Sequence, residues 1–203
     1  MVNLFYLCRR FRFMKKFLIP LICLLAAACS SVPVSKSSEY LAKGEMYYKT
    51  GRVQKALKYF NKAVAEDPYN AEAYLSRGTL LYSAGEYDKA IDDFGVVLDS
   101  DKNVPELYSA LGAAYAAKGE YAKAREALLK SLELYPANVA ALNSLGGIYY
   151  STGNYNAAIK EYDKALALRP VYQIYYMRGV CYEKLGRTQE AEADFKAAEA
   201  LEN

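Results

Sequence analysis

The chain has 203 residues, 53% of them apolar, with 26 Lys and Arg against 23 Asp and Glu, 21 Tyr, four Cys, no His and no Trp. This composition is too apolar for a disordered chain and is sufficient for one or two folded domains. Without His the chain lacks the commonest acid–base catalyst at neutral pH and the commonest ligand of catalytic zinc, which disfavours an enzyme.

Residues 1–28 are predicted to be a secretory signal peptide. Lys15 and Lys16 precede an apolar run over 17–25, and small residues follow at 26–28. A cationic start, a short apolar core and small residues before a cleavage point are typical of such a signal. The apolar run is also shorter than the roughly 20 residues that cross a bilayer. Met14 is the expected true start, and a longer basic leader from Met1 is the alternative.

The net charge of +3 comes from this leader. Five basic residues and no acidic residue precede Cys29, so the rest of the chain carries 21 basic and 23 acidic side chains. The part expected to fold is therefore slightly acidic, and its charge gives no reason to expect a nucleic-acid partner.

The segment from Leu25 to Cys29 resembles the lipobox of bacterial lipoproteins, with Ala26 where that family usually has Leu. The resemblance implies that diacylglycerol is attached to Cys29 and that cleavage occurs in front of it. Ser30, rather than Asp, after the cysteine implies export to the outer membrane, facing the periplasm. Residues 29–36 would then form a short flexible tether. An ordinary cleavage after Ala28, which releases a soluble protein, is the alternative.

From residue 37 the sequence repeats with a period of 34 residues, shortened once to 33. A first glycine recurs in every unit, at Gly44, Gly78, Gly112, Gly146 and Gly179. A second glycine follows seven residues later, at Gly51, Gly85, Gly119, Gly153 and Gly186. A large apolar residue lies sixteen residues after each first glycine, at Phe60, Phe94, Leu128, Tyr162 and Phe195. Such a fixed period indicates a repeat architecture.

Each unit is predicted to be two helices joined by a turn. The apolar residues on either side of the second glycine recur at helical spacing, and this glycine provides the left-handed turn that ends the first helix. The first glycine, which has no side chain, fits where the two helices approach most closely. A proline ends three of the units, and in the second unit Lys102 replaces it, with Pro105 expected in the first turn of the next helix.

These matched positions resemble the tetratricopeptide repeat family over five units, at 37–70, 71–104, 105–138, 139–171 and 172–203. The resemblance implies an all-α fold, a right-handed α-solenoid of about five helix-turn-helix units. It also implies a concave groove lined by the first helix of each unit, a protein or peptide partner, no cofactor, and self-association through the ends as an open alternative.

Ten groove residues follow from the family's pattern: Leu41, Tyr48, Leu75, Thr79, Tyr82, Ser109, Ala113, Asn143, Tyr150 and Tyr176. Tyrosines of this kind can bury apolar side chains of a partner, and the amide of Asn143 can bond its backbone. Small residues in the third and fourth units, among them Ala113, Ala116 and Gly147, leave room for a bulky anchor.

Other chemical groups are expected to be structural. The acidic residues on second helices, Asp92, Asp93, Glu190, Glu192 and Asp194, are predicted to be solvated surface charges rather than a metal or acid–base site. Cys181 is predicted to be a buried structural thiol. The repeat explains every glycine that a phosphate-binding loop would need, and the tyrosines are assigned to packing rather than to nucleic-acid stacking.

The sequence therefore predicts a non-enzymatic scaffold lipoprotein, anchored to the outer membrane, that binds proteins or peptides in its groove for envelope complex assembly. Lipoproteins of this plan serve pilus or cell-wall machinery. The alternative is a soluble secreted or periplasmic protein that is mainly structural and self-associates through its ends.

Overall fold

The computed structural model describes residues 35–202, which form ten helices and no strand. They pair as α2 (Lys36–Lys49) with α3 (Val53–Glu66), α4 (Ala71–Ser83) with α5 (Tyr87–Ser100), α6 (Pro105–Ala117) with α7 (Tyr121–Leu134), α8 (Val139–Ser151) with α9 (Tyr155–Leu168), and α10 (Tyr172–Lys184) with α11 (Thr188–Glu202). The predicted all-α solenoid is confirmed. The signal peptide, Cys29 and nearly all of the tether lie outside the described residues.

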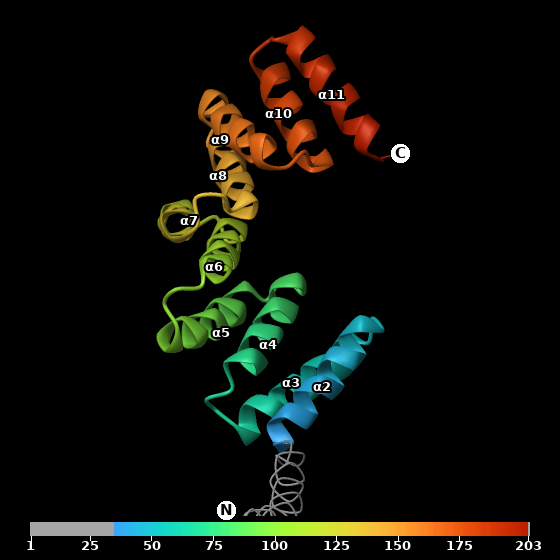
Figure 1. Ribbon diagram of the computed structural model, residues 1–203, viewed down its shortest axis with the longest axis vertical. Coiled ribbons are helices and arrows are strands. Elements are labelled where there is room, and N and C mark those ends of the chain that lie inside the picture. The colour runs from blue at the N-terminus through green and yellow to red at the C-terminus, as the bar shows by residue number, and fades with distance from the viewer. Residues whose placement is uncertain (1–34, 203) are drawn as a thin grey trace, which may run out of the picture.

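The five helix pairs follow one another along an arc that is open on the right in Figure 1. In that view α4 and α6 lie on the inner side of α5 and α7. The first helix starts at Lys36, one residue before the expected start of the repeats, because the hydroxyl of Ser35 accepts a hydrogen bond from the backbone N–H of Ser38 and caps it. Pro105 lies in the first turn of α6, as predicted. Within residues 35–202 no helix has both the length and the apolarity to cross a membrane.

Each first glycine packs against the large apolar residue of its own unit. A Cβ added at Gly112 would lie 2.6 Å from Cγ of Leu128, and one at Gly78 would lie 2.8 Å from the ring of Phe94. These separations are shorter than ordinary non-bonded carbon contacts, so no residue with a side chain fits there unless the facing side chain moves. The predicted close approach of the two helices is confirmed.

Each second glycine ends the first helix of its unit in the left-handed conformation, with φ between 69° and 79°. At Gly85, for example, the glycine N–H donates to the carbonyl of Tyr82 and the next N–H, of Glu86, donates to that of Leu81. The turn thereby satisfies carbonyls that a helix end would otherwise leave free.

Two junctions between units are held by a serine–asparagine pair, which we call the latch. In the third unit Ser131 donates to the carbonyl of Pro105 at 2.7 Å, and the side-chain amide of Asn138 donates to the Ser131 hydroxyl at 2.8 Å. Asn138 also caps α8 by accepting from the N–H groups of Ala140 and Ala141. Ser37 and Asn70 form a similar latch between the first and second units, with the serine on the first helix instead of the second. Ser37 donates to the carbonyl of Ala63, the amide of Asn70 donates to the Ser37 hydroxyl, and Asn70 accepts from the N–H of Ala73.

Two units carry a buried ion pair between their own two helices. Arg77, which immediately precedes a first glycine, donates two hydrogen bonds to Asp93, at 2.8 and 2.6 Å, and Arg178 does the same to Asp194. Asp93 and Asp194 are only 4% and 5% exposed. The prediction that these two carboxylates are solvated is therefore wrong, because arginine forks on the neighbouring first helices neutralise them in the interior.

Candidate functional site

Most of the predicted groove residues are accessible on the first helices of their units. Tyr48, Leu75, Thr79, Tyr82 and Tyr176 are exposed, and Ala113, Asn143 and Tyr150 are half-buried. Four of the exposed residues have large side chains with apolar surface, which on a solvent-facing surface is typical of a contact site.

Leu41 and Ser109 do not belong to this surface, which corrects their assignment. They are 5% and 7% exposed. Both occupy the same place in their units as the exposed Leu75, so the difference lies in the neighbouring helix. Leu41 lies in a buried cluster with Leu80 of α4, and α6 packs against α8, whereas α4 and α6 make at most marginal contact. The residue at this position is buried where its helix contacts the next first helix, as for Leu41 and Ser109. It is exposed to the groove where the two first helices are separated, as for Leu75.

A hollow of about 310 Å³ lies in the groove where α4, α6 and α8 meet. Its lining comprises Tyr82, Ala113, Ala116, Ala117, Tyr121, Ser144, Gly147, Ile148 and Ser151. Tyr82 and Ala113 are predicted groove residues, and Ala116 and Gly147 are among the small residues expected to leave room. The sequence reasoning missed the two serines, Ala117, Ile148 and Tyr121. The serines could have been found from helical spacing, because Ser144 and Ser151 lie three before and four after Gly147. We call this hollow the groove pocket.

The groove pocket exists because one tyrosine is missing. In the second and fourth units a tyrosine at the end of the first helix packs against the tyrosine that starts the second helix, as in the pair Tyr82–Tyr87 at 5.6 Å and the pair Tyr150–Tyr155 at 5.7 Å between ring centroids. In the third unit Ala116 takes the place of the first ring while Tyr121 remains. The space left by that ring is the room in which a partner's side chain can sit.

The lining of the groove pocket is suited to binding. Alanines and Ile148 form an apolar surface, and the hydroxyls of two serines and two tyrosines can donate or accept hydrogen bonds at its edge. About 310 Å³ is at the small end for ligand sites and is enough for one large side chain. In the described part of the chain, no group of three or more Cys, Asp or Glu residues is arranged to hold a metal ion.

Cys181 is fully buried in α10, which confirms the prediction for this residue. Burial raises the pKa of its thiol to about 11, because the thiolate would lose its hydration there. The pKa of Glu120, in the loop between α6 and α7, is shifted downward. Hydrogen bonds from Lys118 and Lys123 stabilise the ionised carboxylate and lower this pKa to about 2.

The comparisons with known proteins agree with this geometry. The family model described as Tetratricopeptide repeat matches residues 41–105, 109–172 and 148–202. The chain belongs to the tetratricopeptide repeat family. It is therefore a repeat scaffold with a protein-interaction fold, and such repeats generally act without catalysing a reaction.

Solved structures with the same fold include that of MamA, which is 28% identical with a TM-score of 0.68 and covers 80% of this chain and 89% of that one. A thermophilic repeat protein from Thermus thermophilus, TTC0263, is 24% identical with a TM-score of 0.67, covering 80% and 89%. The anaphase-promoting complex assembly Cut9–Hcn1 is 22% identical with a TM-score of 0.74, covering 88% of this chain and 36% of that one. These last two support the fold alone. The comparison with curated proteins gives no match.

Proposed function

We propose that the protein is a scaffold that holds a partner polypeptide in its concave groove, with one bulky side chain inserted in the groove pocket. The replacement of a tyrosine by Ala116 carries this proposal, since it opens the groove between Tyr82 and Tyr150, two rings that are each fixed by a neighbouring tyrosine. Rings held in place before binding lose little conformational entropy when a partner arrives.

We further propose that the scaffold acts at the cell envelope, anchored to the outer membrane through a lipid on Cys29 and facing the periplasm, where it helps to assemble an envelope complex of the pilus or cell-wall type. The support is in the sequence: a short apolar signal, the small residues before Cys29 and the polar tether after it. A lipid with several acyl chains gives stable anchoring, and the short tether would hold the groove near the membrane.

The groove proposal is tested by a substitution that places a tyrosine ring in the groove pocket. Ala116→Tyr restores the ring that Tyr48, Tyr82 and Tyr150 provide in other units, and Ala167→Tyr adds the same ring at an exposed site on α9 as a control. With a photo-crosslinking residue at Ser151 in the native cell, the groove proposal expects crosslinks to a partner protein that disappear in Ala116→Tyr and persist in Ala167→Tyr. Crosslinks that survive Ala116→Tyr unchanged would show that the groove pocket is not the binding site.

The anchor is tested separately with Cys29→Ala. The lipoprotein proposal expects the wild-type chain in the membrane fraction and labelled by an alkyne-tagged fatty acid, with both the label and the membrane association lost in the variant. If processing and fractionation are unchanged, the soluble alternative holds. The oligomeric state of that soluble form, measured by light scattering, then tests self-association through the ends.

A further inference from the structure

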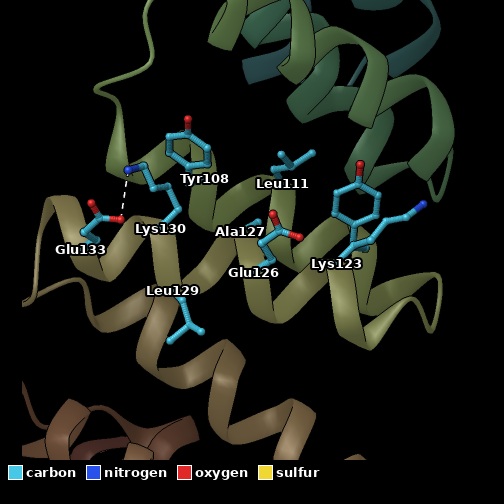
Figure 2. A pocket seen from close by; sticks show the side chains of 9 residues that line it. Tyr108, Leu111, Lys123, Glu126, Ala127, Leu129, Lys130 and Glu133 are labelled. Atoms are coloured by element: carbon cyan, nitrogen blue, oxygen red, sulfur yellow. Dashed lines mark hydrogen bonds and ion pairs between the residues drawn. The ribbon is translucent and has the colours of Figure 1, made fainter.

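A second hollow, of about 700 Å³, lies on the third unit outside the groove. Tyr108, Leu111 and Tyr115 of α6 form one wall, and they fall on a different face of that helix from Ser109 and Ala113, because successive residues turn by about 100°. Figure 2 shows Tyr108 and Leu111 on α6 and the α7 side chains that complete the lining. We call it the outer pocket.

In the second unit, an arginine takes up part of the same place, and a hollow of about 310 Å³ remains beside it. The guanidinium of Arg77 lies 5.3 Å from the ring centroid of Tyr74, donates to Asp93 on α5, and reaches Asn61 on the preceding second helix at 3.1 Å. The fifth unit repeats this arrangement with Arg178, Tyr175, Asp194 and Asp163. The methylene groups of the arginine and its paired guanidinium thus occupy part of the space between three helices, and the hollow there is smaller than the outer pocket.

In the third unit the arginine and both of its hydrogen-bond partners are absent. Leu111 stands where the arginine would be, Ala127 where its carboxylate would be, and Gly95 where the preceding helix would provide a polar side chain. Tyr108 is kept, and no cation is found over its ring in the described structure. A Cβ added at Gly95 would meet nothing within 4 Å, so α5 leaves the space open. The result is an apolar floor between two tyrosines.

Charged residues of α7 border this floor with alternating sign. Lys123, Glu126, Lys130 and Glu133 follow one another at intervals of three, four and three residues, which places them in one stripe along the helix. The stripe is about 15 Å long, from the rise per residue of an α-helix. Lys130 pairs with Glu133, as the dashed line in Figure 2 shows, and Lys123 pairs with Glu120. Among the described residues Glu126 has no ion-pair partner.

We infer that the outer pocket binds one amphipathic helix of a partner protein. A large apolar side chain of that helix inserts between Tyr108 and Tyr115 above Leu111 and Ala127. The charged residues of the partner helix lie opposite charges of the other sign in the α7 stripe, with a basic residue opposite Glu126.

Two features of the surface favour this occupant. A guanidinium in the pocket would lack the carboxylate that Asp93 and Asp194 provide, because Ala127 stands there, so an apolar anchor is the better fit. The alternating charges lie at helical spacing along about three turns, which a partner helix with the opposite order of charges can match along their length. An apolar centre surrounded by charged residues is the usual arrangement of a protein contact.

The test places in the outer pocket the two side chains that the second and fifth units carry there, in a double variant that we call the filled variant. Leu111→Arg combined with Ala127→Asp recreates their ion pair, so the variant is expected to fold as the wild type does, which circular dichroism verifies. The full-length protein carries a photo-crosslinking residue at Leu129, an exposed lining residue, and in a parallel strain at Ser151 in the groove. Crosslinked segments are identified by mass spectrometry.

We expect the Leu129 crosslink to map to a helical segment of another protein that contains a large apolar residue and flanking charges. It should be lost in the filled variant, while the Ser151 crosslink, which reports the groove, is unchanged. A synthetic peptide of the mapped segment should bind the filled variant at least about tenfold more weakly than the wild type, as expected for the loss of one anchor residue. Exchanging charges in Lys130→Glu with Glu133→Lys should also weaken it, and the peptide with its charges exchanged should restore binding.

Several results would overturn the inference. A Leu129 crosslink that persists in the filled variant means that the pocket does not bind the partner. A crosslink to a second copy of this chain means that the surface is a self-contact, and a mapped segment without a large apolar residue means that the chemistry is different. The absence of any Leu129 crosslink while Ser151 still crosslinks removes the outer site and leaves the groove proposal in place.

Discussion

Two adjacent glycines in α8 have different roles at the scale of single residues. A Cβ at Gly146 would collide with the ring of Tyr162, whereas one at Gly147 would meet nothing within 4 Å. We expect Gly146→Ala to lower the free energy of unfolding by about 1–3 kcal/mol, because Tyr162 must move. Gly147→Ala should raise it by about 0.5–1 kcal/mol, since alanine is the better helix former. Urea unfolding followed by circular dichroism measures both, and equal effects of the two substitutions would contradict the close approach of α8 and α9.

The thiol of Cys181 should be inert in the folded protein. Its pKa is raised to about 11 by burial, so only about one thiol in a thousand is ionised at pH 8. In a protein that begins at residue 35, Cys181 is the sole cysteine. We expect a disulfide reagent at pH 8 to react with it at least about a hundredfold more slowly in the native state than in urea, because the thiolate is the reactive species and the native side chain is also inaccessible. A rate similar to that of the unfolded chain would show that α10 opens readily.

The sequence predicts the roles of single residues well where the cause lies within one unit. Both sets of glycines follow from spacing alone, because each contacts its own unit. The burial of Leu41 could not be predicted in this way, since it depends on how closely α4 approaches α2. The pairs Arg77–Asp93 and Arg178–Asp194 did leave a signal: arginine precedes the first glycine, and aspartate follows it sixteen residues later, only in those two units.

At the scale of helices, the first helices of the second to fifth units differ in how their N-termini are capped. Asn70 and Asn138 cap α4 and α8 and also hold a serine of the preceding unit. Val104 and Val171 stand at the corresponding positions before α6 and α10, with no side-chain cap. The latch is therefore present at every second junction between units. The repeat pattern does not predict this, because the capping position is not one of the residues that define the repeat.

The latch gives a direct prediction for helix stability. Asn138→Ala removes two capping bonds and the bond to Ser131 from a residue that is 6% exposed, and we expect it to cost about 1–2 kcal/mol of unfolding free energy. Asn154→Ala is the matched control, because Asn154 caps α9 through one bond of 3.3 Å at an exposed site. Its expected cost is about 0.5 kcal/mol. Equal losses in urea unfolding would mean that the bond to Ser131 adds no stability.

At the scale of the whole molecule, the junction between the second and third units has the fewest polar bonds between units, and we expect it to be the weakest. It has neither the latch nor an arginine that reaches the preceding second helix, as Arg77 reaches Asn61, and α4 and α6 make at most marginal contact. The ion pair that crosses it joins Lys118 to Asp88, whose side chain is 81% exposed, and exposed pairs of this kind add little stability. The same missing arginine opens the outer pocket, and the separation of α4 from α6 exposes Leu75 to the groove, so both candidate binding surfaces lie beside this junction.

In a repeat array, stability is the sum of the unit terms and the interface terms, so a weak interface lets the two sides unfold separately. We expect hydrogen exchange at increasing urea concentrations to show that residues 36–100 and residues 105–202 lose protection at different midpoints. Leu111→Arg with Ala127→Asp and Gly95→Asn adds a fork whose arginine can also reach across this interface, as Arg77 reaches Asn61, and should bring the midpoints together. Arg77→Ala with Asp93→Ala removes such a bond and should separate the first unit from the second. Simultaneous loss of protection in all five units of the wild-type chain would show that the apolar contacts of α5 with α6 alone make the junction as strong as the others.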